Sequence, residues 1–437
     1  MMMNTPYRET INWLFSLKKF GIKLGLSNVS RLLELLGNPH HELRCIHIAG
    51  TNGKGSTAAF LHAIYSRAGY RPGLYTSPHL IDFTERIVIG DAPITPGTVT
   101  ALVKRLRSLC RSNNLEHITF FEFVTALALT YFAQKKADPI ILETGMGGRL
   151  DATNVVDPLV TIITSISREH TAYLGSTLMQ ITPEKAGIIK QGRPCISAVT
   201  RPGPRNCIRQ ACHDKEAQLL EYGRDFSIRQ LSNGYSYRSH KLTLKGLQPA
   251  LAGLHQARNA ALAVTAATLL QLEGYALQDT SVHDGLKSCF WPGRFESVRY
   301  KNRHIVLDGA HNPAAWMALI RTLKNKCSKG KLILIIGIMR DKDMISLQRL
   351  VSQAHTCIFF KPCMDRSAGR EYLEKYIVFS EQKRVFWCET IAQSLKLAHN
   401  KSELRDFICV TGSLFAVGEA RELLNNHRKT SSGRIAL

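Results

Sequence analysis

Short apolar segments alternate along the first half of the chain with segments in which apolar residues recur every three or four positions. Residues 44–50 (RCIHIAG) and 138–144 (DPIILET) are typical of buried strands, whereas residues 56–69 and 123–136 have the helical period. Strands that alternate with helices predict a doubly wound, mostly parallel sheet with helices on both faces. The pattern therefore favours an α/β fold of the P-loop type for this half.

The second half begins with a different pattern. Residues 228–246 (IRQLSNGYSYRSHKLTLKG) predict a β-hairpin around Asn233-Gly234, and residues 289–298 (CFWPGRFESV) predict an interdomain linker with a Trp-Pro-Gly break. Five further apolar segments predict the strands of a smaller Rossmann-like α/β domain: residues 303–312, 331–339, 356–360, 383–389 and 406–413. We therefore expect an ATP-binding domain that includes the substrate site at residues 1–296, and a C-terminal domain at residues 297–437.

Composition adds little to this picture except through charge. The 437 residues carry 57 Lys and Arg against 34 Asp and Glu, a net charge of +23, which makes nucleic-acid binding an alternative to consider. The basic residues are dispersed along the chain without a long run, so we expect no nucleic-acid partner. Eleven irregularly spaced cysteines without a Cys-x-x-Cys pair favour reduced thiols. No signal peptide or membrane-length apolar segment is visible, so we expect a cytoplasmic protein without a membrane partner.

The loop IAGTNGKGS (residues 48–56) resembles a phosphate-binding loop that departs from the strict pattern. Gly-x-x-x-x-Gly-Lys-[Ser/Thr] requires glycine where Ile48 stands and a hydroxyl where Gly55 stands. A glycine-rich turn between a strand and a helix still directs several N–H groups and the helix dipole toward an anion. We therefore expect a phosphate cradle of Thr51, Asn52, Gly53 and Lys54, with any hydroxyl ligand for Mg²⁺ supplied by Ser56 or elsewhere.

Polar side chains follow the other predicted strands at the same sheet edge, where α/β proteins bind ligands. Glu143 ends one strand, His170 follows the next, and Ser77 follows a third. A buried carboxylate needs a partner, and Mg²⁺ prefers oxygen ligands, so these three residues form a candidate metal site. A salt bridge from Glu143 to Arg149 or another arginine is the alternative.

Four further residues are candidates for chemistry. Lys185, in PEKAGIIK, is expected early in a short helix and, by composition alone, on the surface. Arg294 lies in the predicted linker, and Asp308 and His311 follow the first predicted strand of the second domain.

Taken together, the motifs resemble the Mur ligase superfamily, and within it the bacterial dihydrofolate synthase/folylpolyglutamate synthase family. AGTNGKGS, TSPHL, TERI, LETGMGGRLDATN, EKAGI, PGRFE and the DKD motif occur in the family's order over nearly the whole chain. The resemblance implies that the loop binds ATP and that Thr51–Ser56, Asn259, Arg294, Asp308 and His311 surround the nucleotide.

The same resemblance implies the remaining site residues. Ser77, Glu143 and His170 match the residues around Mg²⁺, with two metal sites expected, and Lys185 matches a lysine carried as a carbamate. Lys54, Glu143, His170 and Lys185 are then the expected catalytic residues. Glu169 stands where the family usually has Asp. The expected pterin-binding residues are Gly21, Ile22, Lys23, Leu24, Thr119, Phe120, Phe121, Glu122 and Leu150.

The implied activity is ATP-dependent joining of L-glutamate to dihydropteroate or reduced folates through an acyl phosphate, by a monomer. Two alternatives are less consistent with the sequence. A peptidoglycan-precursor Mur enzyme usually has an additional N-terminal domain, but only about 45 residues precede the loop. A GTPase-like switch requires Asn-Lys-x-Asp, and neither Asn325-Lys326 nor Asn400-Lys401 continues with that aspartate.

Overall fold

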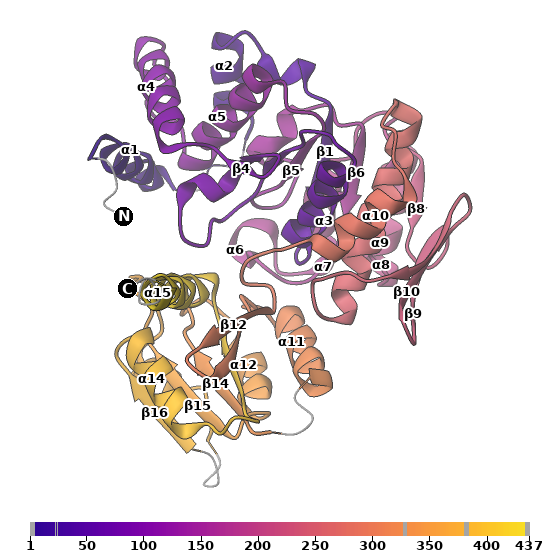
Figure 1. Ribbon diagram of the computed structural model, residues 1–437. Helices are drawn as coiled ribbons and strands as arrows, with labels where there is room; N and C mark the ends of the chain where they lie inside the picture. The colour runs from indigo at the N-terminus through magenta and orange to yellow at the C-terminus, as the bar shows by residue number, and fades with distance from the viewer. Residues whose placement is uncertain (1–4, 22, 24, 327–329, 380–383, 433–437) are drawn as a thin grey trace. The chain divides into compact units, whose positions relative to one another are not determined.

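The computed structural model describes residues 5–21, 23, 25–326, 330–379 and 384–432 (Figure 1). The chain divides into two compact units. The first comprises residues up to Ala250 and Gln256–Cys289, and the second comprises Leu251–His255 and the residues from Phe290 onward. The division into functional domains at residues 296 and 297 stays a prediction, although the change of compact unit falls a few residues before it.

The first unit is built on an eight-stranded sheet in the order β4-β3-β2-β5-β1-β6-β7-β8. The pairs from β2 to β8 are parallel, and β3 runs antiparallel to β2 and β4. Every residue of β1, β5 and β6 is buried, so helices and loops cover both faces of the central sheet. The strands are β1 (Cys45–Ala49), β2 (Gly73–Tyr75), β3 (Ile87–Ile89), β4 (Ala92–Pro93), β5 (Ile140–Glu143), β6 (Val160–Ile163), β7 (Cys195–Ser197) and β8 (Leu219–Glu221).

The helices of this unit follow the predicted alternation with the strands. Helix α3 continues the glycine loop after β1 and packs against β1, β2 and β5. The helices are α1 (Thr5–Ser16), α2 (Ser27–Leu35), α3 (Lys54–Arg67), α4 (Pro96–Ser112), α5 (Phe120–Lys135), α6 (Thr171–Leu174), α7 (Leu178–Ala186), α8 (Pro202–Asp214), α9 (Leu254–Leu270) and α10 (Asp279–Ser288). Short 3₁₀ turns are η1 (Leu17–Phe20), η2 (Pro39–Glu42), η3 (Phe83–Arg86), η4 (Ala152–Val155) and η5 (Gln271–Glu273).

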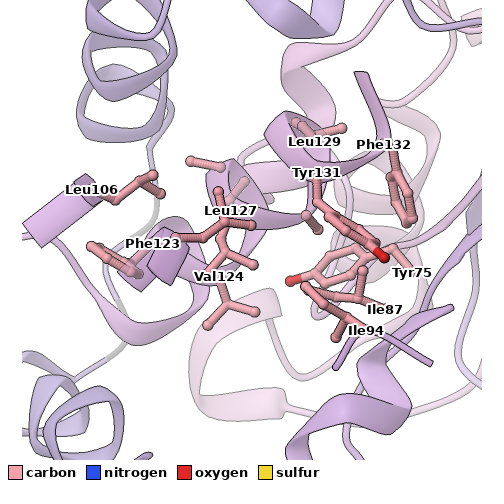
Figure 2. Packing of buried hydrophobic residues seen from close by; sticks show 14 of the residues in the cluster. Tyr75, Ile87, Ile94, Leu106, Phe123, Val124, Leu127, Leu129, Tyr131 and Phe132 are labelled. Carbon is pink, nitrogen blue, oxygen red and sulfur yellow. The ribbon is translucent and has the colours of Figure 1, made fainter. Parts of the chain in front are cut away.

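Helix α5 forms the centre of the largest described hydrophobic cluster (Figure 2). Its sequence is apolar on nearly all sides because α1, α2 and α4 surround it. Phe123, Val124 and Leu127 of α5 pack in this cluster together with Leu106 of α4 and Tyr75 of β2. The first turn of α5 is thereby held next to the carboxyl ends of the strands.

A separate three-stranded antiparallel sheet follows β8. It contains β9 (Phe226–Leu231), β10 (Gly234–Ser239) and β11 (Thr243–Leu247), with β10 in the centre. The predicted hairpin at Asn233-Gly234 is confirmed by the pairing of Leu231 with Gly234. The hydroxyl groups of Tyr237 and Thr265 lie 3.0 Å apart and are hydrogen-bonded, which attaches this sheet to α9.

The second unit has a six-stranded sheet in the order β12-β13-β17-β14-β15-β16, parallel except for the β12–β13 pair. The five predicted strands are present, but the sequence pattern missed β12, which occupies part of the predicted linker. The strands are β12 (Glu296–Tyr300), β13 (Arg303–Leu307), β14 (Leu332–Ile336), β15 (Thr356–Phe360), β16 (Arg384–Cys388) and β17 (Phe407–Thr411). The helices are α11 (Pro313–Lys326), α12 (Met344–Val351), α13 (Arg370–Glu374), α14 (Ile391–Lys401) and α15 (Leu414–Ser432).

The predicted α/β class, with a large mostly parallel sheet and a smaller second α/β unit, is therefore confirmed. Within the described ranges, none of the helices combines the length and the apolar character that crossing a bilayer requires.

Candidate functional site

The candidate site of the first unit lies at the carboxyl ends of three adjacent strands. β1 lies between β5 and β6, and both neighbours run parallel to it. The backbone N–H of Thr144 donates to Ile48 (3.0 Å), and that of Thr164 donates to Ala49 (2.9 Å). The glycine loop after β1, the motif after β5 and the segment after β6 therefore start side by side.

Hydroxyl groups after β6 fix the glycine loop. The Ser165 hydroxyl accepts from the Asn52 N–H (3.0 Å) and donates to the Asn52 carbonyl (2.9 Å). The Thr164 hydroxyl donates to the same carbonyl (2.8 Å), and the Thr51 hydroxyl exchanges hydrogen bonds with the backbone of Ser167. Residues that directly follow β6, the strand next to β1 in the sheet, therefore help to hold the loop in place.

Two loop positions require glycine. Gly50 and Gly53 have φ values of 148° and 92°, which favour glycine. A Cβ atom at Gly50 would overlap the Thr164 hydroxyl, and one at Gly53 would lie 2.5 Å from Oδ1 of Asn259. Asn259, on α9 and about 200 residues further along the chain, therefore lies against the loop.

Two lysines contact one backbone oxygen of this loop. Nζ of Lys54, the first residue of α3, donates to the Gly50 carbonyl (3.1 Å). Nζ of Lys185 donates to the same oxygen from α7 (3.0 Å). Since two like charges beside one carbonyl are unfavourable, this geometry favours the neutral form of one of the two amines.

Lys185 is the amine whose charged form is disfavoured by its surroundings. Its side chain is buried, with the residue only 2% exposed, so the expectation of a surface lysine was wrong. Burial, assisted by the charge of Lys54, lowers the pKa of Lys185 to about 7, while Glu169 and Asp151 act in the opposite direction. The helical context also differs from the prediction, because Lys185 is the penultimate residue of α7 and not an early one.

Glu143 and Ser77 lie together at the ends of β5 and β2. The Ser77 N–H donates to the Glu143 carboxylate (3.2 Å), and Glu143 is only 6% exposed. Arg149, the partner considered for a salt bridge, pairs with Glu184 instead (2.8 Å). Burial lowers the pKa of the Arg86 guanidinium, and the nearby negative charge of Glu143 opposes this shift. Glu143 is therefore a buried acid in a partly cationic environment.

His170 is an exposed residue that immediately precedes α6, with a left-handed φ of 51°. Its segment leaves β6, two strands away from β5 in the sheet order. Among the described residues no three His, Cys, Asp or Glu side chains form a cluster that would hold a metal ion. The expected metal set contains only two residues of those types, so its assignment stays a prediction.

Four of the expected pterin-binding residues, Thr119 to Glu122, lie at the start of α5. Thr119 and Glu122 form a capping box, in which the buried Glu122 carboxylate accepts from the Thr119 N–H (2.8 Å) and hydroxyl (2.7 Å). The Phe121 ring packs against Gly145, where an added Cβ atom would lie 2.6 Å from Cζ of Phe121. The centre of the Phe120 ring lies 5.3 Å from the Arg86 guanidinium. Leu150, on the loop after β5, is partly exposed.

The other expected pterin-binding residues follow η1. Gly21 has a φ of 69°, and Nζ of the exposed Lys23 donates to the His117 carbonyl (3.4 Å). Ile22 and Leu24 lie outside the described residues. The Lys23 contact connects this segment to the chain just before α5.

In the second unit, Asp308 organises the segment that follows β13. Its carboxylate accepts from the N–H groups of Phe295 and Ala310, both at 3.0 Å. Burial raises the pKa of Asp308, while the charge of Arg294 acts in the opposite direction. Nδ1 of His311 lies 2.8 Å from the Gly309 carbonyl. Arg294, Asp308 and His311 thus belong to one locality of this unit.

Comparison with known proteins places this arrangement in a family. The model of the Mur ligase middle domain matches residues 48–267, and the model of the Mur ligase glutamate ligase domain matches residues 293–414. The chain belongs to the Mur ligase family. The matched middle domain contains the glycine loop, Glu143, Lys185 and Asn259, and the matched glutamate ligase domain contains Arg294, Asp308 and His311.

Full-length relatives define the group within the Mur ligases more narrowly. The dihydrofolate synthase/folylpolyglutamate synthase of Bacillus subtilis is 35% identical, with 97% of this chain and 100% of the relative covered. The folylpolyglutamate synthase structure from Thermotoga maritima has a TM-score of 0.82 and 33% identity, covering 96% and 97% of the two chains. The E. coli FolC structure in complex with DHPP and ADP has a TM-score of 0.85 and 30% identity, covering 96% and 98%. The resemblance predicted from the motifs is confirmed.

Sequence reasoning about this Mur ligase missed the residues that hold the loop and surround Glu143. Thr164 and Ser165 were not singled out, and Arg86 was visible only as a letter of the TERI motif. The signal that finds the two hydroxyl residues is their position directly after a buried strand that neighbours β1. Arg86 gave no comparable signal. The residue is only 7% exposed, and this burial results from packing between segments far apart in sequence.

The loop contacts predict that Ser165→Ala weakens nucleotide binding. The substitution removes two hydrogen bonds to Asn52, each worth about 0.5–1.5 kcal/mol net. We expect the dissociation constant for ADP, measured by calorimetry, to rise on the order of 10-fold because the loop is no longer held in its binding conformation. Ser288→Ala, on the exposed part of α10, is the matched control and should bind ADP as the wild type does. An unchanged affinity in Ser165→Ala would show that the loop holds its shape without this hydroxyl.

Proposed function

We propose that this protein is an ATP-dependent ligase that joins L-glutamate to dihydropteroate and to reduced folates through an acyl-phosphate intermediate. The observation that carries the proposal is the full-length relationship to dihydrofolate and folylpolyglutamate synthases. The glycine loop with Lys54 on the Gly50 carbonyl oxygen supports it, because phosphoryl transfer between anions needs a cation that is already in position.

The loop supplies the proposed triphosphate site. Thr51 and Asn52 would shape the cradle, since their N–H groups are bonded to Ser165. The backbone N–H groups from Gly53 to Ser56, at the N-terminus of α3, would bind phosphate oxygens, and Lys54 would neutralise them. Gly55 provides no hydroxyl, whereas Ser56 does and is buried in the first turn of α3. Asn259, Arg294, Asp308 and His311 are proposed as further ATP-binding residues.

The residues around Glu143 fit Mg²⁺ by the chemistry of their donor atoms. Carboxylate and hydroxyl oxygens are ligands that Mg²⁺ prefers, and the nearly complete burial of Glu143 makes a positive partner favourable. We assign Ser77, Glu143 and His170 to this ion, with two metal ions expected in all. When bound, the ions would neutralise the phosphates and stabilise the charge that develops during transfer.

Lys185 fits the proposed carbamate because only a neutral amine reacts with CO₂. Its pKa of about 7 provides that neutral form near physiological pH, whereas an ordinary lysine is almost fully protonated there. A carbamate would replace the positive charge beside Lys54 with a negative one, and thereby remove the repulsion between the two lysines. Lys185 in this form would add an anionic group to the metal side of the site.

The acid substrate is assigned to the beginning of α5 and the segment after η1. The partly exposed ring of Phe121 offers a surface for a pterin ring. The described part of this set also includes Gly21, Lys23, Thr119, Phe120, Glu122 and Leu150. Ile22 and Leu24 belong to the same proposed set. The carboxylate of the acid substrate would take the γ-phosphoryl group of ATP, and the amine of L-glutamate would displace phosphate from the acyl carbon. We further propose that the active form is a cytoplasmic monomer.

The deciding experiment is a pair of ligation assays with the purified protein. We expect release of ADP and phosphate that requires both L-glutamate and a pterin acid, with dihydropteroate and tetrahydrofolate tested side by side. Mass spectrometry of the products should show the addition of one glutamate to dihydropteroate. Release of ADP that depends on neither folate-type acid would contradict the proposal.

A further inference from the structure

One face of the β9–β11 sheet gathers basic and hydroxyl side chains on the surface of the first unit. The opposite side of the sheet is apolar, and Tyr237, Leu244 and Leu247 are buried there. Since side chains alternate along each strand, the intervening residues point outward. We call this surface the basic sheet face: Ser227, Arg229, Ser236, Arg238, Thr243 and Lys245.

Strand pairing sets the spacing of the three cations on this face. Arg238 in the central strand lies opposite Ser227 of β9 and Thr243 of β11, and Arg229 lies opposite Ser236. Arg229 is therefore a diagonal neighbour of Arg238, at about 7–8 Å, with a hydroxyl directly across from each arginine. Lys245 follows Leu244 on β11, where the pairing with β10 becomes irregular beside Ser236. Arg229, Arg238 and Lys245 are all exposed. The result is a row of cations across three strands with donor hydroxyls between them.

Acidic residues do not neutralise this row along the chain. No aspartate or glutamate occurs from Phe226 to Leu272, so none lies on β9, β10 or β11. Asp225, which precedes β9, accepts from the Glu221 N–H (2.7 Å) and pairs with Arg224 (2.7 Å), and His240 approaches it at 3.8 Å. The charge of Asp225 is therefore already engaged next to the sheet.

We propose that the basic sheet face binds the phosphate backbone of RNA. Arginine, lysine and hydroxyl side chains are the usual protein contacts of phosphate oxygens, and here they alternate over one continuous surface. None of the six residues of this face is aromatic, so binding proceeds without base stacking and is independent of sequence. The face also lacks the apolar side chains that insert into a membrane, apart from Leu231 at the hairpin tip.

This inference revises the expectation of no nucleic-acid partner, which rested on the dispersal of basic residues along the chain. The pairing of β9, β10 and β11 brings together charges that sequence spacing keeps apart. Figure 1 shows β9 and β10 at the edge of the first unit, and the side chains of Arg229, Arg238 and Lys245 are exposed there. The proposal concerns a surface separate from the ligase site and does not depend on it.

The test measures binding of a fluorescent 20-nucleotide oligouridylate to the full-length protein over a series of salt concentrations. The variant R229Q/R238Q/K245Q removes the three cations of the basic sheet face. We expect its affinity to fall on the order of 10-fold or more at physiological salt, and the slope of log affinity against log salt to decrease by about 2.

The matched control is K104Q/R105Q/R111Q, which removes the same charge from exposed positions of α4. The proposal requires this control to retain most of the binding, and both variants to keep the wild-type rate of ADP release. Equal losses of RNA affinity in the two variants would show that net charge alone accounts for binding, and would overturn the proposal. Wild-type binding to phosphatidylserine vesicles without binding to the RNA would overturn it as well, in favour of a membrane partner.

Discussion

Replacement of Lys185 by alanine is expected to abolish ligation while the protein remains folded. The side chain lies buried between the glycine loop and Lys54, where the proposed carbamate would supply a charge that no neighbouring residue replaces. A small carboxylic acid or high bicarbonate should restore part of the rate, because such an anion fits the space left by the shortened side chain. Rates of ADP release with and without acetate measure the effect, and circular dichroism monitors folding.

Lys190→Ala is the matched control, since Lys190 is also partly buried and has a lowered pKa but donates to the Asn154 carbonyl (2.9 Å). With ¹³C-labelled bicarbonate, the wild type and Lys190→Ala should show a carbamate carbon signal that Lys185→Ala lacks. At constant dissolved CO₂ the signal should grow as the pH rises through about 7, because the neutral amine increases above the pKa of Lys185. Near-normal activity of Lys185→Ala without any rescue would remove the carbamate assignment.

The same lowered pKa has a consequence for stability. The unfolded chain binds a proton at Lys185 up to its ordinary pKa of about 10.4, whereas the folded protein releases it near pH 7. Between these values the unfolded state binds more protons, so this residue makes the free energy of unfolding rise with pH. Below pH 7 that contribution to stability is absent.

Replacement of Glu143 by alanine should lower the ligation rate on the order of 10³-fold, as the loss of a central electrostatic group often does. Glu143 is buried at the end of β5 next to the Ser77 N–H, at the position proposed for the Mg²⁺ ligand. The concentration of Mg²⁺ that gives half the maximal rate should rise in the same variant, a change that a purely structural role does not produce. Steady-state rates over a Mg²⁺ series measure both effects.

Two further variants separate chemistry from folding. Glu143→Gln keeps the shape and a hydrogen-bond acceptor but removes the charge. We expect it to be nearly as slow as the alanine variant and to unfold at a temperature similar to that of the wild type. Glu34→Ala removes an exposed glutamate that pairs with Arg31 on α2, and should leave the rate unchanged. A rate near wild type for Glu143→Gln would mean that the metal lies elsewhere.

Much of the first unit could be predicted because local signals agree with the final packing. The apolar segments of β1, β5 and β6 are buried on both faces, so their short continuous runs are unambiguous. Helix α5 carries its own start signal in the Thr119–Glu122 capping box. Strand β12 was missed because it forms an antiparallel edge with β13 and adjoins a Trp-Pro-Gly segment typical of a linker.

From the sequence, the candidate site could be proposed as a set of residues, but the environment of those residues could not be predicted. A loop after one strand and an acid after another follow from sequence order, and the motifs indicated their chemistry. The burial of Lys185 did not follow, because α7 alone reads as a partly polar helix and its last turn is covered by the loop after β1. The neutral amine near pH 7 is therefore a consequence of contacts over more than a hundred residues.

By itself the sequence determined the order of strands and helices, the glycine loop, the family motifs and the identity of the candidate ligands, because these depend on neighbours within a few residues. Only the tertiary structure decided which groups share an environment: Ser165 with Asn52, Lys185 with Lys54, and Arg229 with Arg238 and Lys245. The physical reason is that desolvation and Coulomb interactions depend on distance in space, and strand pairing brings together residues that the chain separates.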